Sequence, residues 1–200
     1  TDTPQQWDGA AATTSDWTAA AGTVPNGKYC LVYQNYVYVA GVAANPSRFY
    51  FSNLGDPRTW TATDYVDVHP MGGHVITGMA QYQDLVILTK NRSTYAIFNA
   101  CTGANRLIES SVGSPSPRSL VSTNKGVVFF GHDNIYITDG VRVRPITTHI
   151  QSYFRDSINT AQYDIFAGTY WRGHYYLALA GTASSTNNVV LDLDLNQMDL

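Results

Sequence analysis

The chain has 200 residues, of which 44% are hydrophobic and 14% charged, and its formal net charge at neutral pH is −3. This apolar fraction excludes an intrinsically disordered chain, and the small negative charge gives no electrostatic basis for wrapping nucleic acid. No apolar run reaches the roughly 18 residues of a membrane-spanning helix. The 14 tyrosines and 16 glycines are instead typical of an all-β protein, in which aromatic side chains pack on sheets and glycines form turns.

One pattern recurs four times along the chain: an apolar strand, a short polar turn and a second apolar strand. The turns begin at Gln34, Gln83, Asn124 and Arg172, which gives a period of about 45 residues. A further apolar strand follows each hairpin, at residues 48–52, 93–98, 134–138 and 188–192.

The repeat predicts an all-β fold of the β-propeller class, with about four blades that form part of a larger ring. The predicted units are residues 27–66, 75–114, 117–147 and 160–200, with residues 1–26 as part of a preceding unit. The alternative is a β-sandwich, which would place alternating strands about every 8–12 residues without the longer period. The apolar inner strands favour the propeller, because they would be buried on both faces between neighbouring blades. The chain begins without Met or a basic leader and ends in a predicted strand, so we expect a segment of a longer polypeptide.

A short helix is predicted near residues 148–158, between the third and fourth units. Ile150, Phe154 and Ile158 form one apolar stripe at helical spacing, and Thr147 or Thr148 could cap the start. We expect this helix to pack on the rim of the propeller.

The most distinctive local sequence is Ser52-Asn53-Leu54-Gly55-Asp56-Pro57-Arg58-Thr59-Trp60. It resembles the Asp-box of sialidases and related propellers, although the Asp and the Gly stand in a different order. In that family the Asp and Ser bond the backbone of a hairpin turn, and the Trp packs beneath it. We therefore predict a structural turn built by five residues, namely Ser52, Gly55, Asp56, Thr59 and Trp60.

Metal sites are weakly indicated, and no metal or other cofactor is predicted. His69 and His74 flank a Gly-rich loop, but Asp67 is the only nearby carboxylate that could help them to hold an ion. The run from Asp192 to Asp199 lacks the sixth-position Gly of a calcium loop, so we predict an outer strand with Leu193 and Leu195 facing inward. The two cysteines, Cys30 and Cys101, are predicted to be buried free thiols.

No catalytic residue is predicted, and we expect a protein that is not an enzyme. The sequence has no Gly-x-Ser-x-Gly elbow, no His-Glu-x-x-His motif and no Gly loop that could cradle a phosphate. Glu109 is the only Glu, and the arginines are scattered over turns rather than clustered as a sialidase would need.

Three stretches together resemble a known family. They are RFYFSNLGDPRTW with DYVDV and ITGMAQYQDLVILTKNRSTYAIF, then RSLVSTNKGVVFFGHDNIYITDGVRVRPIT, then AGTYWRGHYYLAL. They look like the propeller-bearing virion proteins of tailed bacteriophages, the tail nozzle, tail tubular and packaged-DNA-stabilising group. The resemblance covers most of residues 27–180 and rests on turns and core strands.

The resemblance implies a structural virion component, a propeller platform in the tail or head–tail connector that assembles around the DNA channel. The implied partners are copies of the chain in a ring and other phage tail or portal proteins, with DNA passing non-specifically and no membrane. The implied location is the virion, assembled in the host cytoplasm. An alternative is a carbohydrate-binding or glycan-processing propeller, suggested by the Asp-box-like turn and by Trp17, Trp60 and Trp171 as exposed aromatic platforms. A general interaction propeller of a cellular protein is a third possibility, although the sequence lacks WD and Kelch signatures.

Overall fold

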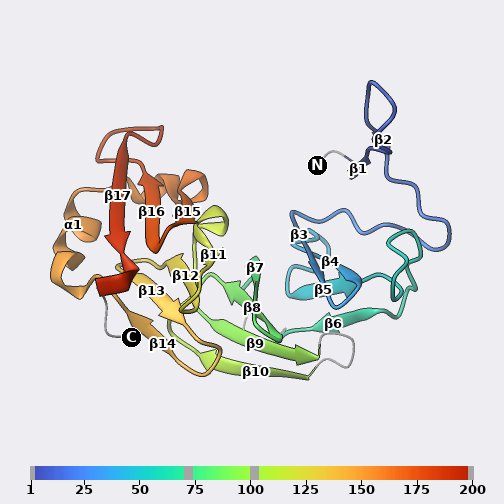
Figure 1. Cartoon of the computed structure of the whole chain (residues 1–200), viewed down its shortest axis with the longest axis horizontal. Helices are drawn as coiled ribbons and strands as arrows, with labels where there is room; N and C mark the ends of the chain where they lie inside the picture. Colours follow the sequence, from blue (N-terminus) through green and yellow to red (C-terminus); the bar gives the residue numbers. More distant parts are fainter. Residues whose placement is uncertain (1–2, 70–73, 100–103, 198–200) are drawn as a thin grey trace. The chain divides into compact units, whose positions relative to one another are not determined.

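The computed structural model describes residues 3–69, 74–99 and 104–197. The chain is mostly β, with antiparallel sheets built from consecutive strands and one short α-helix (Figure 1). It divides into two compact units, Thr1–Ile76 with Asn99–Ala104 and Thr77–Phe98 with Asn105–Leu200. The four blade boundaries predicted from the repeat stay a prediction, because the two compact units do not correspond to single repeats.

The first unit contains a two-stranded sheet and a four-stranded sheet. The strands are β1 (Gln5–Gln6), β2 (Ser15–Asp16), β3 (Tyr29–Tyr33), β4 (Tyr36–Ala40), β5 (Arg48–Phe51) and β6 (Tyr65–Asp67). Strands β3 and β4 form a hairpin in which Tyr33 pairs with Tyr36 across the predicted turn. Gln34 and Asn35 have φ values of 48° and 63°, as a type I′ turn requires.

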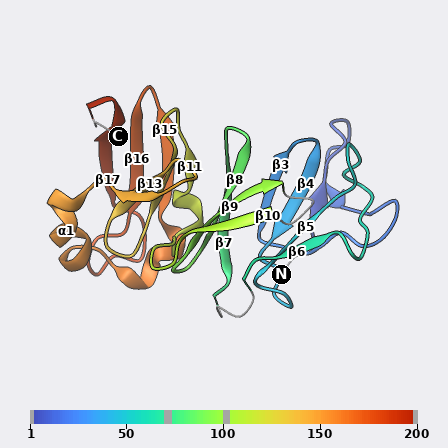
Figure 2. The ribbon, with the colours of Figure 1, turned by 90° about the horizontal axis from the view of Figure 1, so that it is seen from below.

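The remaining strands form three more sheets, each in chain order. Their members are β7 (Ile76–Tyr82), β8 (Leu85–Lys90), β9 (Thr94–Asn99) and β10 (Ala104–Glu109); β11 (Val121–Ser122), β12 (Val127–Phe130), β13 (Ile135–Thr138) and β14 (Val143–Pro145); and β15 (Ala167–Trp171), β16 (His174–Leu179) and β17 (Val189–Asp194). Strands β15, β16 and β17 run side by side in both ribbon views (Figure 2). The predicted hairpins and the strand after each of them are confirmed.

Two inner strands are buried along their whole length. Every residue of β12 and every residue of β13 is buried, which confirms the expectation for strands covered on both faces. In β16, by contrast, buried residues alternate with half-buried ones. Alternation of this kind marks a strand with one well-covered face.

The core of the second unit is an aromatic and aliphatic cluster around Phe130. The ring of Phe130 lies 5.4–5.5 Å, centroid to centroid, from the rings of Phe154, Tyr163 and Phe166. Leu177, Leu179, Leu193 and Leu195 belong to the same cluster. The predicted inward-facing Leu193 of the outer strand is therefore confirmed, whereas Leu195 is buried in the 3₁₀ segment after β17, so the strand is shorter than predicted.

The predicted helix near residues 148–158 is shorter than expected. A 3₁₀ turn at Thr148–Ile150 leads into α1 (Gln151–Asp156), and the helix ends at Ser157. Phe154 is fully buried, whereas Ile150 is only partly covered. Thr147 precedes the 3₁₀ turn, but its side chain makes no capping bond, so the predicted threonine cap is wrong there.

The side chain of Thr147 has other partners. Its hydroxyl donates to Asn134 Oδ1 at 3.0 Å and accepts the N–H of Ile135 at 2.9 Å. These bonds join the segment before the helix to the start of β13. They satisfy a fully buried hydroxyl, which explains why it does not cap the helix.

Short 3₁₀ segments complete the chain, at Pro117–Ser119, Thr160–Ile165 and Leu195–Gln197. No helix in the described ranges is long and apolar enough to cross a bilayer. Cys30 is exposed on β3, so its predicted burial is wrong, and Cys101 lies outside the described residues.

Candidate functional site

The predicted turn residues lie together beside the β3–β4 hairpin. Asn53 and Asp56 form an antiparallel bridge, and Gly55 donates its N–H to the carbonyl of Asn35 at 2.7 Å. Gly55 has a φ of 69°, a left-handed conformation that suits glycine. Hydrogen bonds from the side chain of Thr59 and from the N–H of Arg58 hold the pKa of Asp56 below its ordinary value.

Ser52 and Trp60 attach this turn to its surroundings. The buried hydroxyl of Ser52 accepts the N–H of Val37 and donates to the carbonyl of Asn53, both at 3.0 Å. The indole of Trp60 is 4% exposed and donates to the carbonyl of Pro57 at 2.9 Å. Trp17 packs edge-on against it at 6.0 Å between ring centroids. These contacts connect the turn to the β3–β4 hairpin through Ser52 and to the segment around Trp17 through Trp60.

The tryptophans differ in their exposure. Trp60 is buried, so the hypothesis that it offers a stacking platform to a sugar is wrong, and Trp17 is half-buried. Trp171 is 58% exposed, but the guanidinium of Arg172 lies 4.5 Å from its ring centroid. Trp7 is also exposed, although no motif in the sequence marks it.

The candidate metal loop falls mostly outside the described residues, which omit 70–73. The carbonyl of His74 accepts the hydroxyl of Ser47 at 3.1 Å, and His69 has a φ of 42°. Within the described ranges, no three His, Cys, Asp or Glu side chains are grouped as metal ligands would be.

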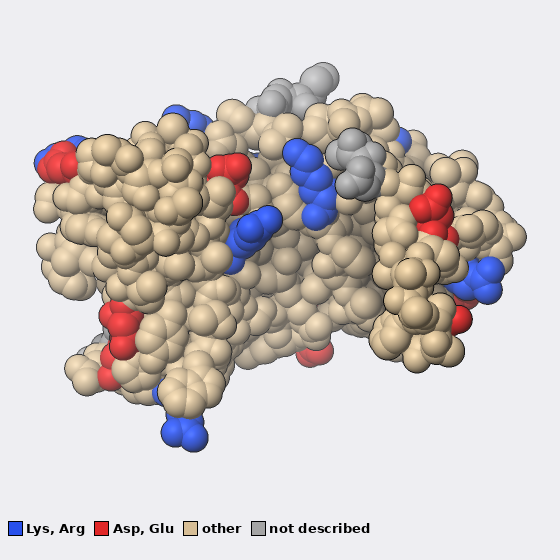
Figure 3. All heavy atoms as spheres, turned by 90° about the horizontal axis from the view of Figure 1, so that it is seen from above, with Lys and Arg blue, Asp and Glu red and all other residues tan. Residues whose placement is uncertain are grey.

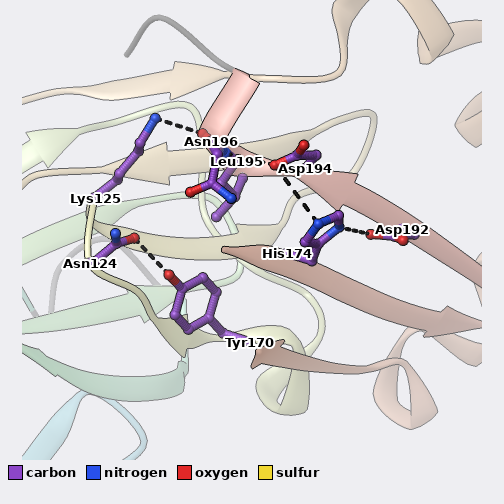
Figure 4. Close-up of polar contacts among 8 residues, drawn as sticks. All are labelled: Asn124, Lys125, Tyr170, His174, Asp192, Asp194, Leu195 and Asn196. Atoms are coloured by element: carbon purple, nitrogen blue, oxygen red, sulfur yellow. Dashed lines mark hydrogen bonds and ion pairs between the residues drawn. The ribbon is translucent and has the colours of Figure 1, made fainter. Parts of the chain in front are cut away.

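His174 of β16 lies between two carboxylates of the neighbouring strand β17 (Figure 4). Its Nδ1 is 2.7 Å from Asp192 Oδ1, and its Nε2 is 4.0 Å from Asp194 Oδ1. The hydrogen bond with Asp192 raises the pKa of His174, and Tyr176 stacks on the imidazole. Two aspartates of the run that was compared with a calcium loop, Asp192 and Asp194, therefore contact a histidine of the adjacent strand. Asp199 of the same run lies outside the described residues.

Two further contacts in Figure 4 join the β11–β12 turn to the last sheet and the segment after it. Lys125 Nζ donates to the carbonyl of Leu195 at 2.6 Å, and the hydroxyl of Tyr170 donates to Asn124 Oδ1 at 2.8 Å. Both contacts lie within the second unit. They give this turn a fixed position relative to β15 and to the end of β17.

A polar cavity of about 410 Å³ lies beside the β12–β13 turn. In its lining, the hydroxyl of Tyr136 donates to Asp133 Oδ1 at 2.7 Å, and His132 Nε2 lies 3.1 Å from the carbonyl of Asn91. Burial and the bond with Asp133 raise the pKa of Tyr136 far above neutrality, so the phenol keeps its proton. Gln151 Nε2 also donates to Asp133. The side chains of His132, Asp133 and Tyr136 therefore each have a hydrogen-bond partner in the protein.

Comparison with known proteins gives a fold likeness only. The chain matches no protein-family model, and no curated protein matches it. Among solved structures, the crystal structure of the computationally designed Ika4 protein, which is propeller-like, has a TM-score of 0.56 with this chain. The match covers 90% of this chain and 98% of the designed one at 11% sequence identity. The chain thus shares its all-β arrangement with a propeller-like protein.

Proposed function

We propose that the chain is a structural component of a tailed-bacteriophage virion. In this proposal it is a β-propeller platform in the tail or head–tail connector that assembles in copies around the DNA channel. The phage-like sequence stretches support it, because they run through three four-stranded sheets and then a three-stranded sheet. That succession of sheets in the segment with the phage-like motifs is the observation that carries the proposal.

The propeller architecture is supported by topology. Each four-stranded sheet consists of four strands in chain order, joined as successive antiparallel neighbours. A propeller blade has this arrangement, and a Greek-key sandwich does not. The likeness to a propeller-like designed protein points the same way.

The surface charge supports a passive role toward DNA. In Figure 3, within the part of each unit that is drawn, Lys and Arg side chains are scattered and acidic side chains lie beside some of them. A protein that grips DNA presents a continuous basic surface. A protein that lines a DNA channel must instead let the DNA slide past it, and scattered charges allow this.

Exposed apolar side chains offer sites for contacts with other subunits. Val32, Leu54 and Val190 are each 64–65% exposed. The fully buried centre of a protein interface is more apolar than the rest of the protein surface.

The test is made on particles of the phage whose genome encodes the chain. We expect mass spectrometry of purified, DNA-filled particles to find the chain at a fixed ratio to the portal protein. Electron microscopy of those particles should then place it in a closed ring around the tail axis. Intact, infectious particles that lack the chain would overturn the proposal.

Carbohydrate binding is the second candidate, favoured by a pocket of about 290 Å³ in the first unit. Tyr50 lines this pocket together with small residues such as Gly22 and Ala62, and the buried Trp60 borders it without offering a stacking surface. A glycan array probed with the chain tests it. Binding that a Tyr50→Ala variant loses would support this candidate, and an array without signal would remove it.

A further inference from the structure

A second polar pocket, of about 340 Å³, lies at one end of the β11–β14 sheet. Val127 pairs with Thr138, so the turn before β12 and the turn after β13 are at the same end of the sheet. The pocket is lined from these two turns by Asn124, Lys125 and Asp139. An open extension of about 430 Å³ shares Asn124 and Tyr82 with it.

Two arginines enter this pocket from the edge strand of the sheet. Arg142 immediately precedes β14 and Arg144 lies within it, with Ile137 as the pairing partner of Arg144. The side chains of both arginines line the pocket. Arg144 is half-buried and Arg142 is exposed.

The pocket carries more positive than negative charge. Lys125, Arg142 and Arg144 line it against a single carboxylate, Asp139. That carboxylate already accepts the N–H groups of Val141 at 2.8 Å and of Arg142 at 3.1 Å. Among the described residues, neither Arg142 nor Arg144 makes a side-chain hydrogen bond or an ion pair shorter than 4.0 Å.

The turns around the pocket are held in place by other contacts. Lys125 donates to the carbonyl of Leu195 (Figure 4), and Arg106 donates to the carbonyl of Gly140 at 2.6 Å. Ser122 donates its hydroxyl to the carbonyl of Gln81. These bonds fix both turns and the end of β7, so the two arginines project from a rigid base. A preformed site loses less entropy when a ligand binds.

We propose that this pocket binds a small phosphate-bearing ligand. The planar guanidinium groups of Arg142 and Arg144 match phosphate oxygens with paired N–H donors, and Lys125 adds a third positive charge. The ring of Tyr82 and the side chain of Ile137 form an apolar wall for the rest of the ligand. The cavity beside the β12–β13 turn is lined by one arginine, Arg92, and one carboxylate, Asp133, so it lacks this excess of positive charge.

The test uses the 200-residue chain in a low-salt chloride buffer, with inorganic phosphate, pyrophosphate and adenosine monophosphate as probes. Nuclear magnetic resonance titration with pyrophosphate should shift the backbone amides of residues 124–126 and 139–144. Tighter binding of adenosine monophosphate than of inorganic phosphate would identify a phosphorylated small molecule as the ligand. The reverse order would identify free phosphate, and both results support a phosphate site.

Substitutions give the quantitative part of the test. The double variant R142Q/R144Q should weaken pyrophosphate binding by about tenfold or more, because two charged donors are lost. The matched control R118Q/R155Q removes two positive charges from exposed positions outside the pocket and should stay within about twofold of wild type. Asp139→Asn keeps the oxygen that accepts the turn amides but removes the negative charge, and it should tighten binding roughly threefold.

Several results would overturn the proposal. They are amide shifts centred elsewhere, equal weakening by the control pair, or no binding of any probe at millimolar concentrations. Tighter binding of a single-stranded oligonucleotide than of pyrophosphate would also overturn it, since the ligand would then be nucleic acid. Thermal denaturation of each variant shows whether a loss of binding is a loss of fold.

Discussion

At the scale of single residues, His174 shows how strand register creates a charged contact. On β16 it pairs directly with Asp194 of β17, while Asp192 pairs with Tyr176 two positions away. The imidazole therefore reaches the carboxylates of both aspartates on the same face of the sheet. Cross-strand neighbours of opposite charge stabilise a sheet modestly.

This contact predicts a pH dependence. The pKa of His174 is raised above 6.5 by the hydrogen bond with Asp192, so the folded state holds this proton more tightly than the unfolded state. The resulting contribution to stability is fully present below about pH 6.5 and is lost as the pH rises through the folded pKa. A proton NMR titration of the imidazole should show the raised pKa.

Asp192→Asn should return this pKa toward its ordinary value, because the main cause of the shift is removed. Asp164→Asn is the control, since it removes an equal charge from an exposed position on the Thr160–Ile165 segment. An unchanged His174 pKa in Asp192→Asn would contradict the assignment.

The sequence predicts part of this residue-level picture. The alternation of Asp and Leu identifies Leu193 as buried, because strand periodicity is local, but it does not show that the strand ends at Asp194 before Leu195. The partner of the aspartates could not be predicted, since it depends on the register across the loop between β16 and β17. Cys30 was wrongly expected to be buried, because β3 is an edge strand whose residues alternate between covered and exposed positions.

At the scale of elements, the Ser52–Trp60 turn is the most specific local structure in the first unit. Trp60 lies beneath it, and the backbone N–H of Trp60 donates to the carbonyl of Ala21 at 3.0 Å. The indole of Trp60 therefore contacts both the turn, through Pro57, and the N-terminal segment, through the ring of Trp17. Its indole bond to Pro57 satisfies the one polar atom that is buried with it.

Replacing Trp60 with Ala should lower the free energy of unfolding by about 3 kcal/mol, because it leaves a cavity under the turn. Trp171→Ala removes the same side chain from an exposed site and should change it by less than about 0.5 kcal/mol. Urea denaturation followed by circular dichroism measures both. Equal effects of the two substitutions would show that Trp60 is not the buried support described above.

Element boundaries were harder to predict than element types. The stripe of Ile150, Phe154 and Ile158 correctly indicates a helix, but hydrogen bonding ends it at Ser157. Thr147 satisfies its hydroxyl in the neighbouring sheet rather than at the helix start, which is a tertiary effect invisible in the local sequence. The sequence also does not predict the outer strands β6, β10 and β14. Their residues are mostly exposed or half-buried, so they lack a strong apolar pattern.

At the scale of the whole molecule, the division into two compact units has consequences for stability. The aromatic cluster around Phe130 belongs to the second unit, and the Trp17–Trp60 pair belongs to the first. Each unit thus has buried aromatic residues of its own. Units with separate cores can unfold in separate transitions.

We therefore predict two transitions in differential scanning calorimetry. Phe154→Ala should lower the midpoint of only one of them, at a cost of about 3–5 kcal/mol to that unit. Trp60→Ala should lower only the other. Hydrogen exchange with mass spectrometry assigns each transition to residues, and a single transition that both substitutions shift would contradict independent cores.

The order of the strands also bears on how the chain folds and changes over generations. In every sheet each strand pairs with the strand that precedes or follows it in the sequence. Such pairings join strands that are neighbours in the sequence, so each sheet can form soon after its last strand leaves the ribosome. A stretch of gene that encodes one sheet can likewise be copied or lost as a block without breaking the pairing in its neighbours.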